Sequence, residues 1–244
     1  MTDILMLVYG RPPETITCPK TSLPHPGVTM YLTISDRRTG QAEGRPKHRA
    51  AIALFLAVGS SGCAPMRVPL GYGTLDVNPP APKTEAGQIA VARFDDARSS
   101  EYATGDEIGQ MRNLYGMPVK KIEGSQNPVL WVSGGLVNGL AAEGFTVERV
   151  ESAQTAGALP TVVGKVSKVF VDTYMAQTAW VDAEVGIDQR GVRLFSTSCS
   201  GEATQTGWWG TEEEYRSILA LAMENFLKAC VPKLTPILSQ YAAK

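Results

Sequence analysis

The sequence predicts an α+β fold in which a mostly antiparallel sheet carries two helices on one face. Three observations favour it. Residues 179–188 alternate apolar and polar side chains, which is typical of a strand with one face in water. Two amphipathic segments, 127–144 and 211–230, begin with residues that cap helices. The elements follow in the order β-α-β-β-β-α, and we expect them to form a single domain over residues 87–244.

The first half of this domain contains a strand, a helix and a second strand. Residues 88–94 alternate as a core strand does. Asn127 and Pro128 open the helix, because Asn accepts hydrogen bonds at an N-cap and Pro fits the first turn. Gly144 ends it, and 145–150 is a short strand.

The second half contains three strands and the last helix. We expect strands over 161–172, 179–188 and 192–206, with a hairpin turn between the last two. Residues 211–214, Thr-Glu-Glu-Glu, form a capping box with acidic residues in the first helical turn. The last helix therefore packs an apolar stripe against the sheet.

The region before the domain has the features of an export signal. Basic residues precede an apolar run at 50–58, and small residues then lead to Cys63. This order predicts a secretory signal over 30–62 that ends in a lipid-modified Cys63. The alternatives are an ordinary signal or a buried apolar segment. Residues 1–29 are expected to be unstructured or to precede the true start, and 63–86 to be a Pro-rich tether.

Charge and composition exclude several function classes. After Cys63 the chain has sixteen Lys and Arg against twenty Asp and Glu, and both histidines, His25 and His48, come earlier. A mildly acidic domain lacks the basic surface of a nucleic-acid-binding protein. A domain without histidine also lacks the commonest general base and metal ligand. We therefore expect a protein that is no enzyme and holds no metal or cofactor.

Cysteine usage agrees with export. If Cys63 is acylated, Cys199 and Cys230 remain as a pair within the domain. Two buried free thiols are one possibility. Cys230, however, follows Phe226 by four residues on the apolar stripe of the last helix, so it faces the sheet that contains Cys199. The sequence therefore predicts a disulfide between them.

Residues 97–127 form the first candidate binding surface. A strand-to-helix connection of this length is usually functional. It contains Arg112, Asn113 and Tyr115 among apolar residues, and Arg and Tyr are enriched at the centres of interfaces. Alternatively, the segment caps one end of the core, and Arg112 neutralises Asp95 or Asp96.

Exposed tryptophans and acidic residues are the other candidates. Trp208 and Trp209 precede the last helix, and Trp180 lies on the polar face of its strand, so these three are expected to contact a partner. Four acidic residues near the first strand are more simply read as solvated or paired with Arg98 and Arg112 than as a metal site. They are Asp95, Asp96, Asp106 and Glu107.

The chain resembles the YajG-type family of bacterial lipoproteins. The resemblance rests on the lipobox-like signal, the strand IAVARFDDAR, the helix and strand LVNGLAAEGFTV, the turn DQRG and the amphipathic last helix. It implies an outer-membrane lipoprotein, because Ala64, and not Asp, follows Cys63. The family has no established catalytic residues to carry over. In this family, the connection between the first strand and the first helix is usually shorter than residues 97–127 of this chain.

These observations together predict a lipid-anchored, non-enzymatic envelope protein that faces the periplasm. Its partner would be an envelope protein complex, bound through 97–127 or the polar face of the sheet. The alternative is a module that binds a glycan or small ligand with Trp180, Trp208 and Trp209.

Overall fold

The computed structural model describes residues 64–73, 85–102, 105–206 and 210–242. These stretches belong to one compact unit that begins at Ala64. Several predictions fall outside the described residues: the signal over 30–62, the lipidation of Cys63, and the exposure of Trp208 and Trp209.

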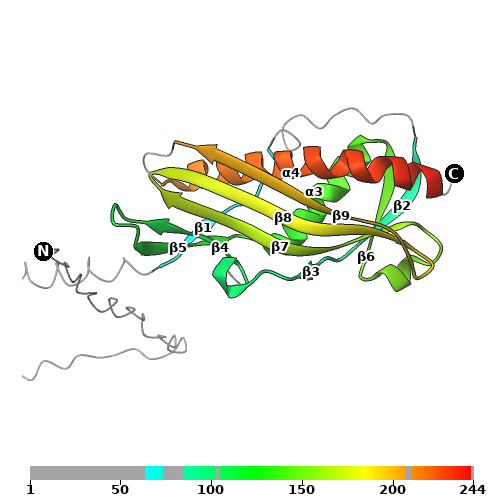
Figure 1. Ribbon diagram of the computed structural model, residues 1–244, viewed down its shortest axis with the longest axis horizontal. Coiled ribbons are helices and arrows are strands. Elements are labelled where there is room, and N and C mark those ends of the chain that lie inside the picture. Colours follow the sequence, from blue (N-terminus) through cyan, green and yellow to red (C-terminus); the bar gives the residue numbers. More distant parts are fainter. Residues whose placement is uncertain (1–63, 74–84, 103–104, 207–209, 243–244) are drawn as a thin grey trace, which may run out of the picture. The chain divides into compact units, whose positions relative to one another are not determined.

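Three long neighbouring strands form one side of the sheet (Figure 1). They are β7 (Thr161–Tyr174), β8 (Ala176–Gln189) and β9 (Val192–Gln205), and each runs antiparallel to the next. In β8 the predicted alternation is confirmed, because Val181, Val185 and their neighbours on that side are buried while Trp180 and Glu184 are on the other side. The side with Trp180 is called the outer face below.

The other edge of β7 pairs with three short strands in succession. These are β2 (Gly87–Ala92), β3 (Asp95–Asp96) and β4 (Glu107–Arg112), and all three run parallel to β7. The α+β class is therefore confirmed, and the long pairings are antiparallel as predicted, but the sheet is mixed because these short strands run parallel to β7. Alternation along one strand reports its buried side and carries no information on the direction of its neighbours, which explains the difference.

Three further strands extend the sheet. β5 (Pro118–Gly124) forms an antiparallel hairpin with β4, and β1 (Met66–Val68) runs parallel to β5. β6 (Phe145–Val150) runs parallel to β2. The segment 97–127 therefore contains two strands of the sheet, preceded by a turn of 3-10 helix, η2 (Ser100–Tyr102), and the prediction of a long connecting loop is wrong.

The tether predicted over 63–86 is also shorter than expected. Met66 is already paired with Ile122, and Val68 and Leu70 are buried in the core. The indole N–H of Trp131 donates to the carbonyl of Gly71 over 3.0 Å. Prolines on both sides concealed a three-residue strand, whose length is too short for a pattern to show.

Two helices cover one face of the sheet (Figure 1). Helix α3 (Pro128–Ala142) begins at Asn127, whose side chain accepts from the N–H groups of Val129 and Leu130. Helix α4 (Glu212–Tyr241) begins with the predicted capping box of Thr211 and Glu214. Both N-cap predictions are confirmed.

The two helices also contact each other. Gly135 and Gly139 of α3 face Met223 and Val231 of α4, so these glycines allow a close helix–helix approach. The core lies between the helices and the inner face of the sheet. Its largest fully buried side chains include Trp131, Tyr215 and Phe226.

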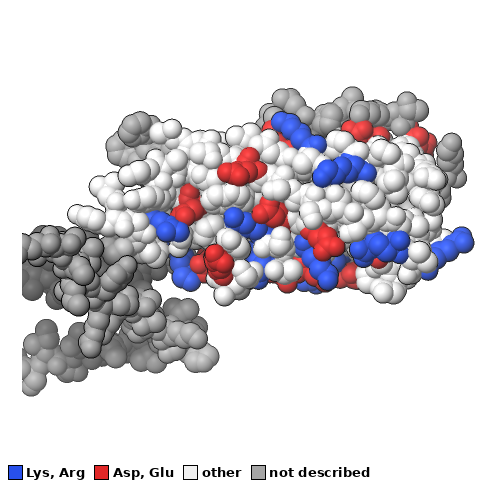
Figure 2. Space-filling view, viewed as in Figure 1, with Lys and Arg blue, Asp and Glu red and all other residues white. Residues whose placement is uncertain are grey.

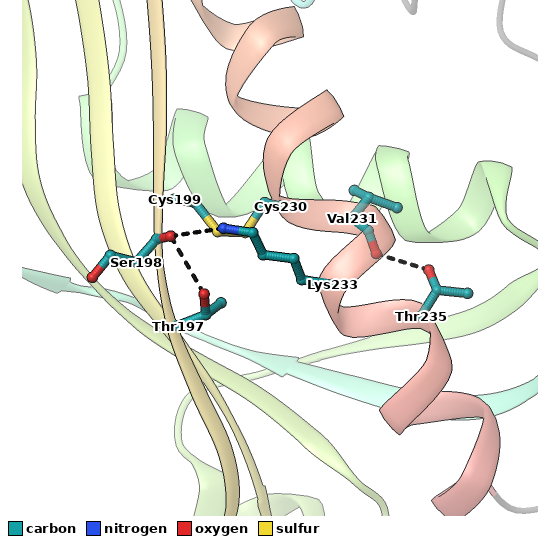
Figure 3. Close-up of a disulfide and its surroundings, with 7 residues drawn as sticks. All are labelled: Thr197, Ser198, Cys199, Cys230, Val231, Lys233 and Thr235. Carbon is teal, nitrogen blue, oxygen red and sulfur yellow. Dashed lines mark hydrogen bonds between the residues drawn. A yellow bond between two sulfur atoms is a disulfide. The ribbon is translucent and has the colours of Figure 1, made fainter.

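A disulfide joins α4 to β9, as the sequence predicts (Figure 3). Cys199 and Cys230 are both buried, and their Cα atoms are 5.3 Å apart. On either side of it, α4 side chains bind carbonyl groups of β9. Lys233 donates to Ser198 over 3.2 Å and Asn225 donates to Glu202 over 2.8 Å. Polar side chains of the helix thus satisfy part of the edge of β9.

Candidate functional site

Exposed apolar side chains gather at one end of the molecule, on two neighbouring turns. Leu114 and Tyr115, in the β4–β5 turn, are each 85% exposed, and Met175, in the β7–β8 turn, is 79% exposed. The two turns adjoin because β4 pairs with β7, and Gly116 faces the ring of Tyr174. We call this surface the apolar end: Leu114, Tyr115, Met117, Val119, Tyr174 and Met175.

Asn113 holds the first of these turns in shape. Its side-chain oxygen accepts from the N–H of Tyr115 over 2.9 Å and from that of Met117 over 3.0 Å. Its own N–H donates to the carbonyl of Met117 over 2.9 Å. The side-chain oxygen of Asn113 is therefore turned toward the backbone, and it fixes the turn that presents Leu114 and Tyr115.

The second turn is tighter. Met175 alone separates Tyr174 and Ala176, which are paired with each other. Its φ of 61° lies in the left-handed region. This conformation is unfavourable for a residue with a Cβ atom and is readily adopted by glycine. The backbone therefore keeps a large, exposed apolar residue at a position that favours glycine.

The apolar end carries no charge of its own. Neither 113–119 nor 173–181 contains Asp, Glu, Lys or Arg, and the face in Figure 2 is white at this end. Behind the turns, Arg112 Nε donates to Asp172 Oδ1 over 2.8 Å. The alternative in which Arg112 neutralises Asp95 or Asp96 is therefore wrong, because register places Arg112 beside the far end of β7.

A second cluster lies on the outer face, around Trp180. The ammonium of Lys168 is 4.0 Å from the centroid of the Trp180 ring and 4.4 Å from that of Tyr102. Phe170, opposite Trp180 in the neighbouring strand, stacks on it with ring centroids 6.5 Å apart. Tyr102 meets Phe170 edge to face at 6.0 Å. The cluster thus combines three aromatic rings and one cation on the face that the helices leave open.

Polar side chains line two hollows farther along this face. One, of about 480 Å³, lies beside Asp182, Glu184 and Ser200, and the other, of about 320 Å³, lies beside Asp188 and Arg193. Ser200 donates to Asp182, Arg193 donates to Asp188, and the bonded carboxylate raises the pKa of Arg193. The polar groups of this face are thus paired across neighbouring strands.

Arg98 organises the predicted acidic cluster. Its fully buried side chain donates to both carboxylate oxygens of Asp96, over 2.9 and 2.8 Å, and to the carbonyls of Gly105 and Glu107. The hydrogen bond from Arg98 lowers the pKa of Asp96. Glu107 pairs with Lys121 over 2.7 Å. Two of the four acids are therefore paired, and Asp95 and Asp106 are exposed.

Other chemical features of the described residues are few. Burial raises the pKa of Tyr215, whose hydroxyl is bonded to that of Thr173 over 3.0 Å. Within the described residues, His, Cys, Asp and Glu side chains form no group of three placed to hold a metal ion. Among the described helices, none is long and apolar enough to cross a membrane.

The structure thus separates the predicted binding residues into two places. Tyr115 belongs to the apolar end and Trp180 to the outer face, while Arg112 pairs with Asp172 and Asn113 bonds the backbone of the first turn. The sequence reasoning missed Tyr174 and Met175 at the apolar end, and Tyr102, Lys168 and Phe170 around Trp180. Two consecutive large apolar residues between two alternating strands were a usable signal for the first pair.

Comparison with known proteins finds similarity among solved structures. No family model and no curated protein matches the sequence. A DUF330 protein from Xanthomonas campestris is 11% identical, with a TM-score of 0.48 over 72% of this chain and 94% of that one. The lipoprotein GNA1162 from Neisseria meningitidis is 10% identical, with a TM-score of 0.32 over 62% and 99%. PelC from Paraburkholderia phytofirmans, a dodecamer, is 14% identical, with a TM-score of 0.37 over 68% and 95%.

Proposed function

We propose that this protein is a lipid-anchored, non-enzymatic component of the outer membrane, held by acylated Cys63, that binds another envelope protein through the outer face of its sheet. The observation that carries the proposal is the cluster of Tyr102, Lys168, Phe170 and Trp180 on the face without helices. The signal-like sequence before Cys63 supports the anchor.

The composition of the outer face favours a protein partner. Aromatic residues supply most of the energy at the centres of protein interfaces, and polar groups surround them. Here Trp180 and Tyr102 lie beside a surface of paired side chains, such as Ser200 with Asp182 and Ser196 with Glu184. Each of these carboxylates keeps its negative charge, so a partner that covers them would have to present basic groups to them.

Two features weigh against other functions for this face. Lys168 lies over the ring of Trp180, so a sugar that stacked on that side would have to displace the cation. Nucleophilic and acidic groups in the hollows are bonded to each other, and no histidine follows Cys63 to act as their base. A binding role does not require the serine hydroxyls or the carboxylates to take part in a reaction.

The proposal is tested by photo-cross-linking in cells that produce the full chain. A photoreactive residue replaces Glu202, which is exposed and lies opposite Trp180 in the neighbouring strand. We expect one discrete protein adduct from this position. Trp180→Ala should abolish the adduct, and Leu221→Ala, on the exposed side of α4, is the matched control that should retain it.

Two results would overturn the proposal. Absence of any protein adduct from position 202 would remove the partner site, and an unmodified Cys63 in the intact mass of the native protein would remove the anchor. The melting temperature of Trp180→Ala is measured alongside, so that loss of the adduct is not mistaken for unfolding.

A further inference from the structure

We propose that the apolar end is seated in the surface of the phospholipid bilayer that holds the acyl chains of Cys63. The domain would then stand on the membrane on its β4–β5 and β7–β8 turns. This inference rests on the proposed acylation, and it adds a second contact with a defined ligand, the lipid surface.

Strand pairing places the start of the described chain at the apolar end. β1 runs parallel to β5, with Met66 beside Ile122. β5 begins at Pro118, directly after the β4–β5 turn, so residues that precede Met66 lie on the side of Ile122 that faces this turn. Figure 1 shows the cyan start of β1 at the same end as the two turns.

The distances involved are short. At about 3.3 Å per residue, Pro118 is roughly 13 Å before Ile122 along β5, and Ala64, two residues before β1 begins, is at most roughly 7 Å from Met66. Along the direction of the strands, Ala64 therefore lies within roughly 6–13 Å of Pro118, where the β4–β5 turn ends. Cys63 is bonded to Ala64, so acyl chains on Cys63 would enter a bilayer beside the turns. In the described part of the chain, only Ala64 and Pro65 precede β1, so little length separates the domain from the lipid.

The chemistry of the apolar end suits lipid. Leu114 and Met175 are aliphatic and project from turns, whereas a protein partner is usually bound by a packed and partly polar patch. Tyr115 and Tyr174 are of the type that collects at the membrane interface, where the ring is buried and the hydroxyl stays in water. No charge lies within either turn to oppose insertion to a depth of about 5–10 Å.

The strained turn at Met175 is the second observation. Residues held in sparsely populated backbone regions persist where the surrounding structure fixes them, and they cluster at functional sites. Met175 supplies an exposed apolar side chain that glycine lacks. At the opposite end, Arg190 of the β8–β9 turn has a similar φ of 51° but carries a charge, so it provides a matched control.

The test uses photo-cross-linking to lipid in bacterial envelopes that contain the full chain. A photoreactive residue is placed at position 115, 175 or 190, and adducts are identified by mass spectrometry. Phospholipid adducts from 115 and 175, with none from 190, are expected. Protein adducts from 115 and 175, no adducts from them, or equal lipid adducts from all three positions would each overturn the inference.

Two substitutions separate the lipid contact from folding. Met175→Gly should decrease the lipid adducts formed from position 115 while the melting temperature stays the same or rises. Arg190→Gly should change the melting temperature similarly and leave the lipid adducts unchanged. Equal lipid adducts in both variants would show that Met175 does not contact lipid and would overturn the inference.

Intact mass distinguishes this inference from the proposed function. If Cys63 is acylated but the turns give no lipid adducts, the anchor stands and the seating of the apolar end is refuted. If Cys63 is unmodified, the anchor itself is refuted, whatever the adducts from 115 and 175 show.

Discussion

Removal of the Cys199–Cys230 disulfide should destabilise the domain strongly. The bridge joins residues separated by 31 positions and ties α4 to β9. In the chain-entropy account, closing a loop of this length stabilises the folded state by roughly 3–4 kcal/mol, because it restricts the unfolded chain. For a domain of this size, that change corresponds to a melting temperature lower by roughly 6–16 °C.

The assay compares three samples in guanidinium chloride and by thermal unfolding: oxidised protein, reduced protein, and the Cys199→Ala, Cys230→Ala variant. Oxidised protein should be the most stable, and the other two should agree within about 1 kcal/mol, since each lacks the bridge. The oxidised protein should also have the smaller m-value, because its cross-linked unfolded chain exposes less surface. Reductant should have no effect on the double variant.

A small effect would refute this reasoning. If oxidised and reduced proteins differ by less than about 1 kcal/mol, then α4 is held by its apolar face alone and the unfolded chain is already compact. Thiol labelling of unreduced, denatured protein gives an independent check, since two labelled cysteines per domain would show that the native protein has no bridge.

Three further predictions concern packing and charge. Gly201→Ala should destabilise the domain by several kcal/mol, because the added Cβ would meet the backbone of α4. Gly186→Ala should destabilise it far less, because the added Cβ would meet only the end of the flexible Arg193 side chain. Urea unfolding of the two variants compares their free energies of unfolding. Arg98→Met should cost about 3 kcal/mol or more, measured the same way, because four hydrogen bonds from its buried side chain are lost. Because Arg98 lowers the pKa of Asp96 below its ordinary 3.8, stability should fall as pH decreases from about 4 through the folded pKa, and Asp96→Asn should flatten that fall.

The parts of the fold that the sequence predicted are those with a sustained local signal. The alternation in β8 continues for ten residues, and the caps at Asn127 and Thr211 act through neighbouring N–H groups. The disulfide was predictable because Cys230 lies on the buried stripe of α4 and Cys199 lies in the sheet beneath it. Each of these signals depends on residues close together in the sequence.

The sequence reasoning missed the strands whose pairing interrupts the local pattern. β4 and β5 have register shifts between Glu107 and Gly109 and between Met111 and Arg112, so their alternation is broken. Gly109 packs against the backbone of Val171, a contact that only the long-range pairing of β4 with β7 explains. Such strands are formed by distant partners more than by their own pattern.

The candidate sites divide in the same way. Tyr115 was predictable as exposed because Asn113 and Gly116 favour a turn around it, and the alternation of its strand placed Trp180 on the outer face, where it is half-buried. Their partners were not predictable, because Tyr174 and Met175 reach Tyr115 through the pairing of β4 with β7, and Lys168 reaches Trp180 across β7 and β8. To predict which side chains of different strands lie together, one must know the register of strand pairing, and the sequence does not show it.

The position of β1 also restricts which envelope proteins could be the partner that we propose. A long tether would allow the domain to reach components far from its membrane, but Met66 is already in the sheet three residues after Cys63. If the apolar end rests on lipid, Trp180 lies five residues along β8 from Met175, which is about 17 Å. A protein that binds the outer face would then have to lie within roughly that distance of the bilayer surface. Partners that are themselves membrane-bound meet this condition, and proteins that diffuse freely in the periplasm gain nothing from it.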